Sequence, residues 1–376
     1  VANILEMANA DYPKNIDFRR KLAHLYGASF STSVSRRGEA HLIDLNVSFV
    51  RPEHLPEGAV LTQEILELLE AVLFRPLTEK DGFNQQIFEM EKRNLIAYLE
   101  SEVEDNFYHA DLELNALFYQ KSDLRIPRVA TKKLVEKETS QTAFQAYKNM
   151  LQLDKIDIFV AGQFDQDYME NFFRSLPLSF RNPKLALDYQ QEFSKITREK
   201  AERKEANQSI LELAYHLQVL YTDVNYPALV VFNNLFGSSA HSKLFVQLRE
   251  REGLAYTVGS SLHVFSGMMR VYAGIDRKER LRVMKLIRQQ LSDMKLGKFS
   301  DEDLLLSKKV LTTDAKLSQD RVSTIMEEAY NRSIYGDQVR TYSQWIDAVN
   351  SVSREDIMAV AKGIKLQAVY FMEGIQ

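Results

Sequence analysis

Apolar residues recur at helical spacing in several stretches of the first half of the chain. Between residues 60 and 74 they return every three or four positions, and similar spacing runs through 16–27, 83–103, 106–120 and 139–151. Such spacing predicts amphipathic helices. Alternation on both sides of "RRGE" predicts a β-hairpin that turns at Arg37 and Gly38, with a second arm over 42–50. The run "KIDIFVAGQF" predicts a short buried strand over 156–161.

A comparable order of elements returns in the second half. The stretch "SILELAYHLQVLY" predicts a strand, "YPALVVFNNLFG" a helix and "AYTVGSSLHVFSGMMRVYAGI" a pair of strands. Helices are expected over 277–295 and 301–317, and "QAVYFMEG" ends the chain as a strand followed by glycine, as "DIFVAGQF" does earlier. Two halves of similar layout indicate an internal duplication.

The segment 181–208 separates the two halves. It is poor in large apolar side chains, and its most charged part reads "TREKAERKEANQ", a composition typical of a linker. We therefore expect one α+β domain over residues 1–180, a linker over 181–208 and a second α+β domain over 209–376. The length of 376 residues suits two domains.

Charge and composition exclude several classes of function. The net charge of −4 provides no general attraction for nucleic acid, although local basic patches are compatible with it. No window holds the roughly 18 apolar residues of a membrane span. The absence of cysteine excludes disulfides and thiolate chemistry and favours a cytoplasmic protein. The chain opens at Val1 within a helical pattern, which leaves open whether a first strand or a signal segment precedes that residue.

The run "FGSSAHSKLFVQLREREGLAYTV", residues 236–258, has a plain structural interpretation. Gly237 would end one helix, Leu244 and Leu248 would be buried in the next, Gly253 would stop it and Tyr256 would begin a strand. The same run resembles the second-half signature of the insulinase or pitrilysin family of zinc metallopeptidases. That signature reads approximately G-G-x-x-x-S-R-L-F followed by R-E-x-x-G-L-A-Y.

The resemblance implies roles for two residues of this run. In the family, the Arg and Tyr come from the non-catalytic half, reach across an enclosed cavity, bind substrate and polarise its scissile carbonyl. By position they are Arg249 and Tyr256 here. The chemistry is reasonable, because a guanidinium can donate two hydrogen bonds at once and a phenol can donate to an oxygen that gains negative charge.

The first half departs from the family. Its zinc motif, H-x-x-E-H, lies in a pattern such as A-H-F-L-E-H-M, whereas this chain opens "VANILEMANA". The alignment puts Asn3 and Met7 at the two histidine positions and keeps only Glu6. In "FNQQIFEMEKRNLIAYLES" the third ligand position falls on Tyr98, and Glu91 takes the place of the family's second-shell carboxylate. Amide, thioether and phenol are poor zinc ligands.

The positions aligned with the family's zinc site, called vestigial here, lead to specific expectations. We expect Glu6 to face solvent or pair with a cation, Glu91 to be an ordinary surface carboxylate, and Asn3 to share a hydrogen bond with Tyr98. No pair of histidines in the chain has H-x-x-x-H or H-x-x-E-H spacing, so no compensating zinc site is expected. The histidines are His24, His41, His54, His109, His216, His241 and His263.

The resemblance covers essentially the whole chain. It implies two related α+β domains, each a mainly antiparallel sheet with helices packed on one face, which face each other like the halves of a clamshell. It also implies a catalytically deficient subunit that pairs with a zinc-bearing homologue and binds unfolded peptide. Zinc is expected only in that partner, and no cofactor or metal in this chain.

Two other functions stay open. One is a non-enzymatic peptide-binding or scaffold protein, including a homodimer, that uses the same cavity. The other is an active hydrolase with unrelated chemistry, but the chain contains no G-x-S-x-G, P-loop or dinucleotide motif. A neighbouring gene for a related chain with H-x-x-E-H would favour the paired enzyme.

Overall fold

The computed structural model describes residues 1–55 and 60–375. The chain divides into two compact units. Unit 1 comprises Val1–Arg36, Ala40–Glu102 and Pro127–Leu185, and unit 2 comprises Arg37–Glu39, Val103–Ile126 and Ala186–Gln376. The predicted first domain therefore loses residues 103–126 to unit 2, and the two units part within the predicted linker.

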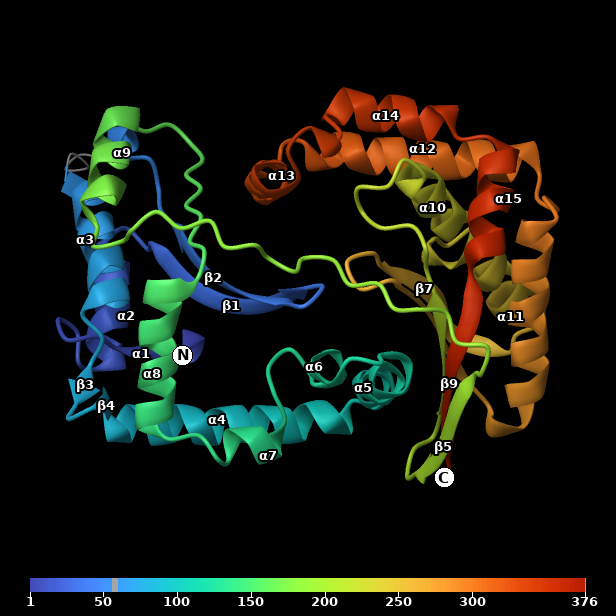
Figure 1. Cartoon of the computed structure of the whole chain (residues 1–376), viewed down its shortest axis with the longest axis horizontal. Helices are drawn as coiled ribbons and strands as arrows, with labels where there is room; N and C mark the ends of the chain where they lie inside the picture. The colour runs from blue at the N-terminus through green and yellow to red at the C-terminus, as the bar shows by residue number, and fades with distance from the viewer. Residues whose placement is uncertain (56–59, 376) are drawn as a thin grey trace. The chain divides into compact units, whose positions relative to one another are not determined.

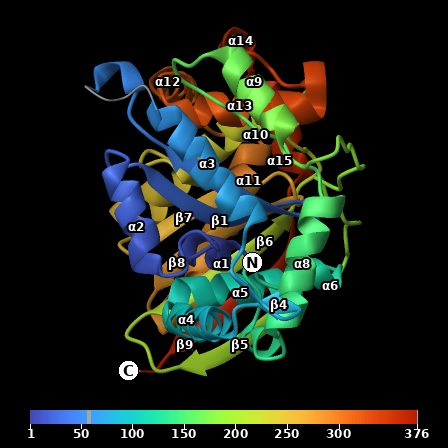
Figure 2. The same cartoon turned by 90° about the vertical axis from the view of Figure 1, so that its left-hand side faces the viewer.

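Unit 1 is built mostly from helices around a two-stranded hairpin. Its core joins Phe18, Phe30 and Ile65, with the ring centroids of the two phenylalanines 5.8 Å apart, and Figure 2 shows the helices that carry it beside the hairpin. The main elements are α1 (Ala2–Met7), α2 (Asn15–His24), β1 (Ser29–Arg37), β2 (Ala40–Ser48), α3 (Leu61–Phe74), β3 (Thr78–Glu79), β4 (Gly82–Phe83), α4 (Gln85–Glu104), α7 (Lys132–Val135), α8 (Ser140–Leu153) and α9 (Gln166–Ser175). The hairpin turns at Gly38, which has a φ of +51°, as predicted.

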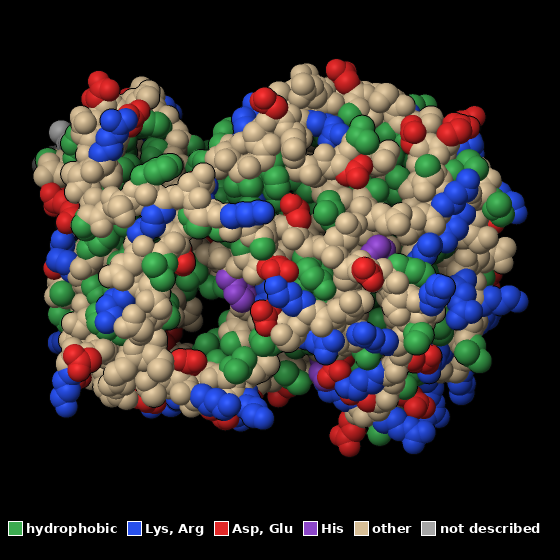
Figure 3. Space-filling model, in the orientation of Figure 1, with side chains coloured by type: hydrophobic (Ala, Val, Ile, Leu, Met, Phe, Trp, Pro, Cys, Tyr) green, Lys and Arg blue, Asp and Glu red, His purple; other side chains and the backbone are tan. Residues whose placement is uncertain are grey.

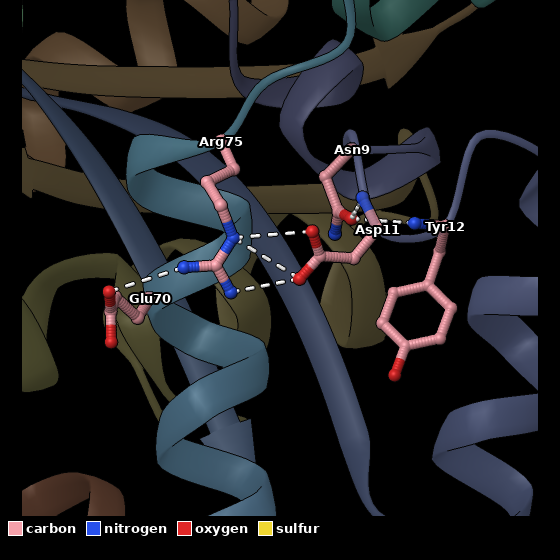
Figure 4. A network of polar contacts seen from close by, with 5 residues as sticks. All are labelled: Asn9, Asp11, Tyr12, Glu70 and Arg75. Carbon is pink, nitrogen blue, oxygen red and sulfur yellow. Dashed lines mark hydrogen bonds and ion pairs between the residues drawn. The ribbon is translucent and has the colours of Figure 1, made fainter.

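A polar network fixes the segment that follows α1 (Figure 4). Arg75, just after α3, donates to both carboxylate oxygens of Asp11, at 2.8 Å from Nη2 to Oδ2, and to Glu70 at 3.2 Å. The hydrogen bond to Asp11 raises the pKa of Arg75. Asn9 Oδ1 accepts from the backbone nitrogens of Asp11 and Tyr12 at 3.0 and 2.9 Å. The network thereby ties the exit of α1 to the end of α3.

Unit 2 is centred on one five-stranded sheet of order β5-β9-β6-β8-β7 (Figure 1). The pair β5–β9 is parallel and the other neighbours are antiparallel. The strands are β5 (Arg198–Lys204), β6 (Ser209–His216), β7 (Ala255–His263), β8 (Met268–Ile275) and β9 (Lys365–Gly374). The main helices are α5 (Asn106–Phe118), α6 (Ser122–Arg125), α10 (Tyr226–Asn233), α11 (Arg280–Lys295), α12 (Asp301–Ser318), α13 (Val322–Tyr335), α14 (Tyr342–Ser351) and α15 (Arg354–Gly363).

The sheet of unit 2 is covered on both faces. Every residue of β6 is buried. Leu211 and Leu213 point into the main core, which α10, α11 and α15 complete, while Ile210 and Ala214 face a second cluster with Ala110, Leu114 and Phe118 of α5. Since successive strand residues point to opposite faces, one strand serves both cores. The predicted helices on one face are present, and α5 adds cover on the other.

Three sequence-based expectations are corrected. The predicted linker 181–208 contains β5, because its alternating charged residues pair along β9 from Arg198 opposite Ala368 to Lys204 opposite Gly374. The predicted strand over 156–161 does not form, and Ile158 there is 44% exposed. Strands need a hydrogen-bonded neighbour, and among the described residues of unit 1 the hairpin strands pair only with each other. The expected duplication therefore does not extend to the sheets: the described residues of unit 1 form two-stranded sheets, whereas unit 2 has a five-stranded sheet.

A buried ion pair lies beneath α5. Glu212 of β6 is fully buried and accepts from Arg270 of β8 at 2.6 Å, and Arg270 also meets Asp111 of α5 at 3.2 Å. Burial raises the pKa of Glu212 to about 7, although the hydrogen bond from Arg270 opposes the shift. This raised pKa makes the stability of the fold depend on pH.

We expect Glu212→Gln to flatten the dependence of stability on pH between pH 5 and pH 7. An unfolded glutamate titrates near about 4.3, so the folded chain holds this proton more tightly. The stabilisation is full below that value and is lost as pH rises towards about 7. Urea denaturation at pH 5 and at pH 7 measures the free energy of unfolding of both proteins. The prediction is contradicted if the wild type loses no more stability than the variant from pH 5 to pH 7.

Candidate functional site

The segment that carries Arg249 is a turn of π-helix rather than the expected α-helix. It spans Phe245–Arg251, and at its end the backbone N–H of Glu252 donates to the carbonyl of Gln247 at 3.2 Å. Gly253 then reverses the chain with a φ of +61°, a conformation that suits glycine. Short π-helical turns are frequent at functional sites, and this one directs Arg249 outward from a buried Leu248.

Tyr256 lies at an irregularity of β7. Ala255 pairs with Ile275 and Thr257 with Gly274, so Tyr256 has no partner of its own on β8. Such a bulge redirects a side chain away from the sheet, and the Tyr256 side chain is 76% exposed. The bulge explains why the Tyr256 side chain is exposed although Ala255 and Val258 of the same strand are part of the core.

The side chains of Arg249 and Tyr256 lie against each other. The guanidinium carbon of Arg249 lies 5.1 Å from the ring centroid of Tyr256 and 4.8 Å from that of Phe245. A cation held over aromatic rings keeps its N–H groups at the edge of the stack, free to donate. The pair therefore presents an exposed hydrogen-bonding surface built from residues that are seven positions apart.

Close packing around Gly237 explains the first glycine of the motif. A Cβ atom at Gly237 would lie 2.4 Å from Oγ of Ser260 and 3.0 Å from a methyl group of Leu244. Only glycine lets the end of the preceding helix approach β7 so closely. Ser260 in turn donates to Asn233 of α10 at 2.7 Å, which holds β7 against that helix.

A polar cavity of about 500 Å³ opens beside Tyr256. Its lining includes Gly253, Leu254, Tyr256, Gly274, Arg277 and Lys278. The two cations precede α11, over which Lys and Arg side chains gather in Figure 3. Sequence analysis did not select Arg277 and Lys278, although the charged run "DRKERLR" in which they lie was visible. Exposed aromatic, glycine backbone and cationic groups together suit a peptide that carries carbonyl and carboxylate oxygens.

The positions aligned with the zinc motif lie in unit 1. Ile4 and Leu5 of α1 share the core with Phe88 of α4, so the two helices that carry these positions pack in one cluster. Asn3 is exposed. The carbonyl and the sulfur of Met7 accept from the Asn15 amide at 3.0 and 3.5 Å.

Two expectations for α4 are wrong. Tyr98 donates its hydroxyl proton to Glu102 on the next turn of its own helix, and no hydrogen bond to Asn3 is present among the described residues. The side chain is 44% exposed, which allows this local alternative. Glu91 is not a surface carboxylate: it is only 8% exposed and accepts from Asn94 at 2.9 Å.

Glu6 is paired with a cation, as predicted. Arg19 of α2 donates to one carboxylate oxygen at 2.9 Å, and the backbone and hydroxyl of Thr32 donate to the other at 3.0 and 3.1 Å. The pKa of Glu6 is lowered because these hydrogen bonds outweigh its partial burial, which acts in the opposite direction. A carboxylate held in this way is a structural link between α1, α2 and β1.

These residues do not fit the zinc of the family. Zinc takes imidazole, thiolate or carboxylate ligands, and the three aligned positions supply an exposed amide, a thioether that already accepts a hydrogen bond and a phenol committed to Glu102.

Known proteins resemble the chain over its whole length. A family model described as Peptidase M16 inactive domain matches residues 137–311. A Bacillus subtilis protein named a probable inactive metalloprotease, YmfF, is 26% identical over all of this chain and 88% of its own length. A second B. subtilis protein, named an uncharacterized zinc protease, YmxG, is 26% identical over 73% of this chain and 67% of its own.

Solved structures agree. A conserved protein from Enterococcus faecalis V583 is 35% identical, with a TM-score of 0.95 over all of this chain and 88% of that one. The M16 inactive-domain structure from Pseudomonas fluorescens has a TM-score of 0.78 at 15% identity, over 100% of this chain and 87% of that one. The latter likeness concerns the fold alone.

Fold and site together define a metallopeptidase-like protein without the zinc ligands of an active one. The chain is similar to M16 peptidases, the insulinase or pitrilysin type, and among them to proteins described as inactive. Within the described residues, no helix combines the length and apolar character that crossing a membrane requires.

Proposed function

We propose that this chain is the non-catalytic subunit of a two-chain peptidase, in which Arg249 and Tyr256 bind the peptide and stabilise the carbonyl oxygen that is attacked. The observation that carries the proposal is the contrast between the two motifs. The Arg249–Tyr256 pair is stacked, exposed and open to a ligand, whereas the zinc positions hold groups committed to other contacts. The subunit acts in the cytoplasm on unfolded peptides and carries no zinc at the vestigial positions.

The partner is a homologue that retains H-x-x-E-H. One organism, B. subtilis, holds both a relative named probably inactive and a relative named a zinc protease, which supports the existence of such pairs. The polar cavity beside Tyr256 gives the peptide a place next to the pair. A homodimer that binds peptide without cutting it is the second candidate, and the cavity serves it equally well.

We expect the purified chain alone to show no zinc-dependent peptidase activity. The aligned positions lack every zinc ligand, so no water can be activated there. The assay incubates the chain with zinc and a mixture of unfolded peptides, and mass spectrometry detects cleavage. A zinc-bearing M16 relative serves as the positive control. Any cleavage by the chain alone that a chelator abolishes would contradict the assignment, and the Glu6→Gln variant would show whether the vestigial site is responsible.

A further inference from the structure

Three side chains that can bind a metal converge on the α5 side of the unit 2 sheet. His109 and Glu113 lie one helical turn apart on α5, and Glu202 lies on β5. Their ligand atoms all lie within 4.8 Å of one another. Sequence analysis missed the group because it sought pairs of histidines, whereas His109 and Glu113 form an H-x-x-x-E pair whose third member is distant in sequence.

The three side chains are held in place by the elements around them. Their side chains are half-buried, with His109 17% and Glu202 28% exposed. His109 Nε2 contacts Glu202 Oε1, and the buried Tyr370 of β9 donates to the same oxygen at 2.6 Å. A hydrogen bond to a ligating carboxylate orients it and is typical of built metal sites.

A cation already lies between the two carboxylates of the group. The ammonium of Lys200 contacts Glu113 Oε2 and lies 3.5 Å from Glu202 Oε2. Lys200 is two residues from Glu202 on β5, so both side chains leave the same face of the strand. The ammonium marks the place where two carboxylates favour positive charge. Its flexible stem and 39% exposed side chain let it move to solvent.

We propose that His109, Glu113 and Glu202 bind one divalent transition-metal ion of the zinc class, in exchange with the Lys200 ammonium. One imidazole and two carboxylates suit zinc or a similar first-row transition metal. Calcium needs more oxygen ligands, and magnesium needs an octahedral set of oxygen ligands. Ligand atoms of tetrahedral zinc lie about 3.4 Å apart, so small rotations of the three side chains complete the site. A water takes the fourth position. The ion links α5 to β5 and revises the expectation that this chain carries no metal.

The proposal is independent of the proposed subunit role, because it uses no residue of the Arg249 motif. The full-length chain, stripped of metal, is titrated with Zn²⁺ against a chromophoric chelator. We expect one ion per chain, an affinity reduced at least 10-fold in each of His109→Ala and Glu113→Gln, and an affinity increased in Lys200→Met, which removes the competing ammonium. His54→Ala, which changes an exposed histidine of unit 1, should bind zinc as the wild type does.

Circular dichroism shows whether each variant is folded, and Glu113→Gln keeps the size of its side chain if His109→Ala does not fold. The proposal is overturned if the wild type binds less than one ion per chain, if folded Glu113→Gln retains wild-type affinity, or if Lys200→Met binds more weakly than the wild type. Failure of this titration leaves the subunit role intact, because that role is tested by peptide cleavage with a partner.

Discussion

Replacing Arg249 or Tyr256 by alanine is expected to lower kcat/KM of the reconstituted two-chain peptidase by about 100-fold, the cost of removing one donor to a developing oxyanion. The two side chains are stacked with 5.1 Å between the guanidinium carbon and the ring centroid, so each orients the other. We therefore expect the double variant to be little worse than either single variant. Initial rates with a fluorogenic peptide measure the effect.

The control for this prediction is Arg251→Ala. Arg251 is an exposed arginine at the end of the same π-helical turn, and its loss removes equal charge without touching the Arg249–Tyr256 stack. Tyr256→Phe keeps the stack and removes only the hydroxyl, so it separates hydrogen bonding from packing. Full activity in Arg249→Ala and Tyr256→Ala, or an equal loss in Arg251→Ala, would refute the role of the pair.

The second large effect is structural: Arg270→Ala should destabilise the fold by about 3–5 kcal/mol, the range for breaking a buried ion pair from one side. The substitution leaves fully buried Glu212 without its cation and removes the 3.2 Å contact that joins β8 to Asp111 of α5. Urea denaturation measures the change. We expect α5, which rests on this face of the sheet, to be the first element to lose hydrogen-exchange protection.

Arg282→Ala is the matched control. Arg282 pairs with Glu252 at the surface, where both side chains are partly solvated, and such pairs contribute about 1 kcal/mol or less. If the two substitutions lower the free energy of unfolding equally, the Arg270–Glu212 pair does not stabilise the fold as a buried ion pair would.

Elements set by local sequence were predictable. The periodicity over 60–74 became α3, and the turn at Gly38 and the helix, glycine and strand of 236–258 are present, because each depends on side chains close together in the chain. Arg249 and Tyr256 were selected from the family resemblance of this run, and their roles stay a prediction. The π-helical turn was not predicted, and neither was the bulge at Tyr256, which arises in the pairing of β7 with β8.

What failed depended on partners distant in sequence. The apolar run at 156–161 carries a strand pattern but has no neighbouring strand among the described residues. The helix α5 belongs by sequence to the first half, yet its apolar stripe of Ala110 and Leu114 completes the second core. Tyr98 is the exception, because its partner Glu102 lies one turn away on its own helix, a local contact that a ligand alignment does not reveal.

The most direct test of the subunit role is cleavage by a mixture. The chain is combined with the homologue from the same genome that carries H-x-x-E-H, and zinc-dependent cleavage of an unfolded peptide is measured for each chain alone and for the two together. The account predicts negligible activity for either chain alone, and activity for the equimolar mixture that is lost with Arg249→Ala. A homologue that is fully active alone, and that gains nothing when this chain is added, would contradict it.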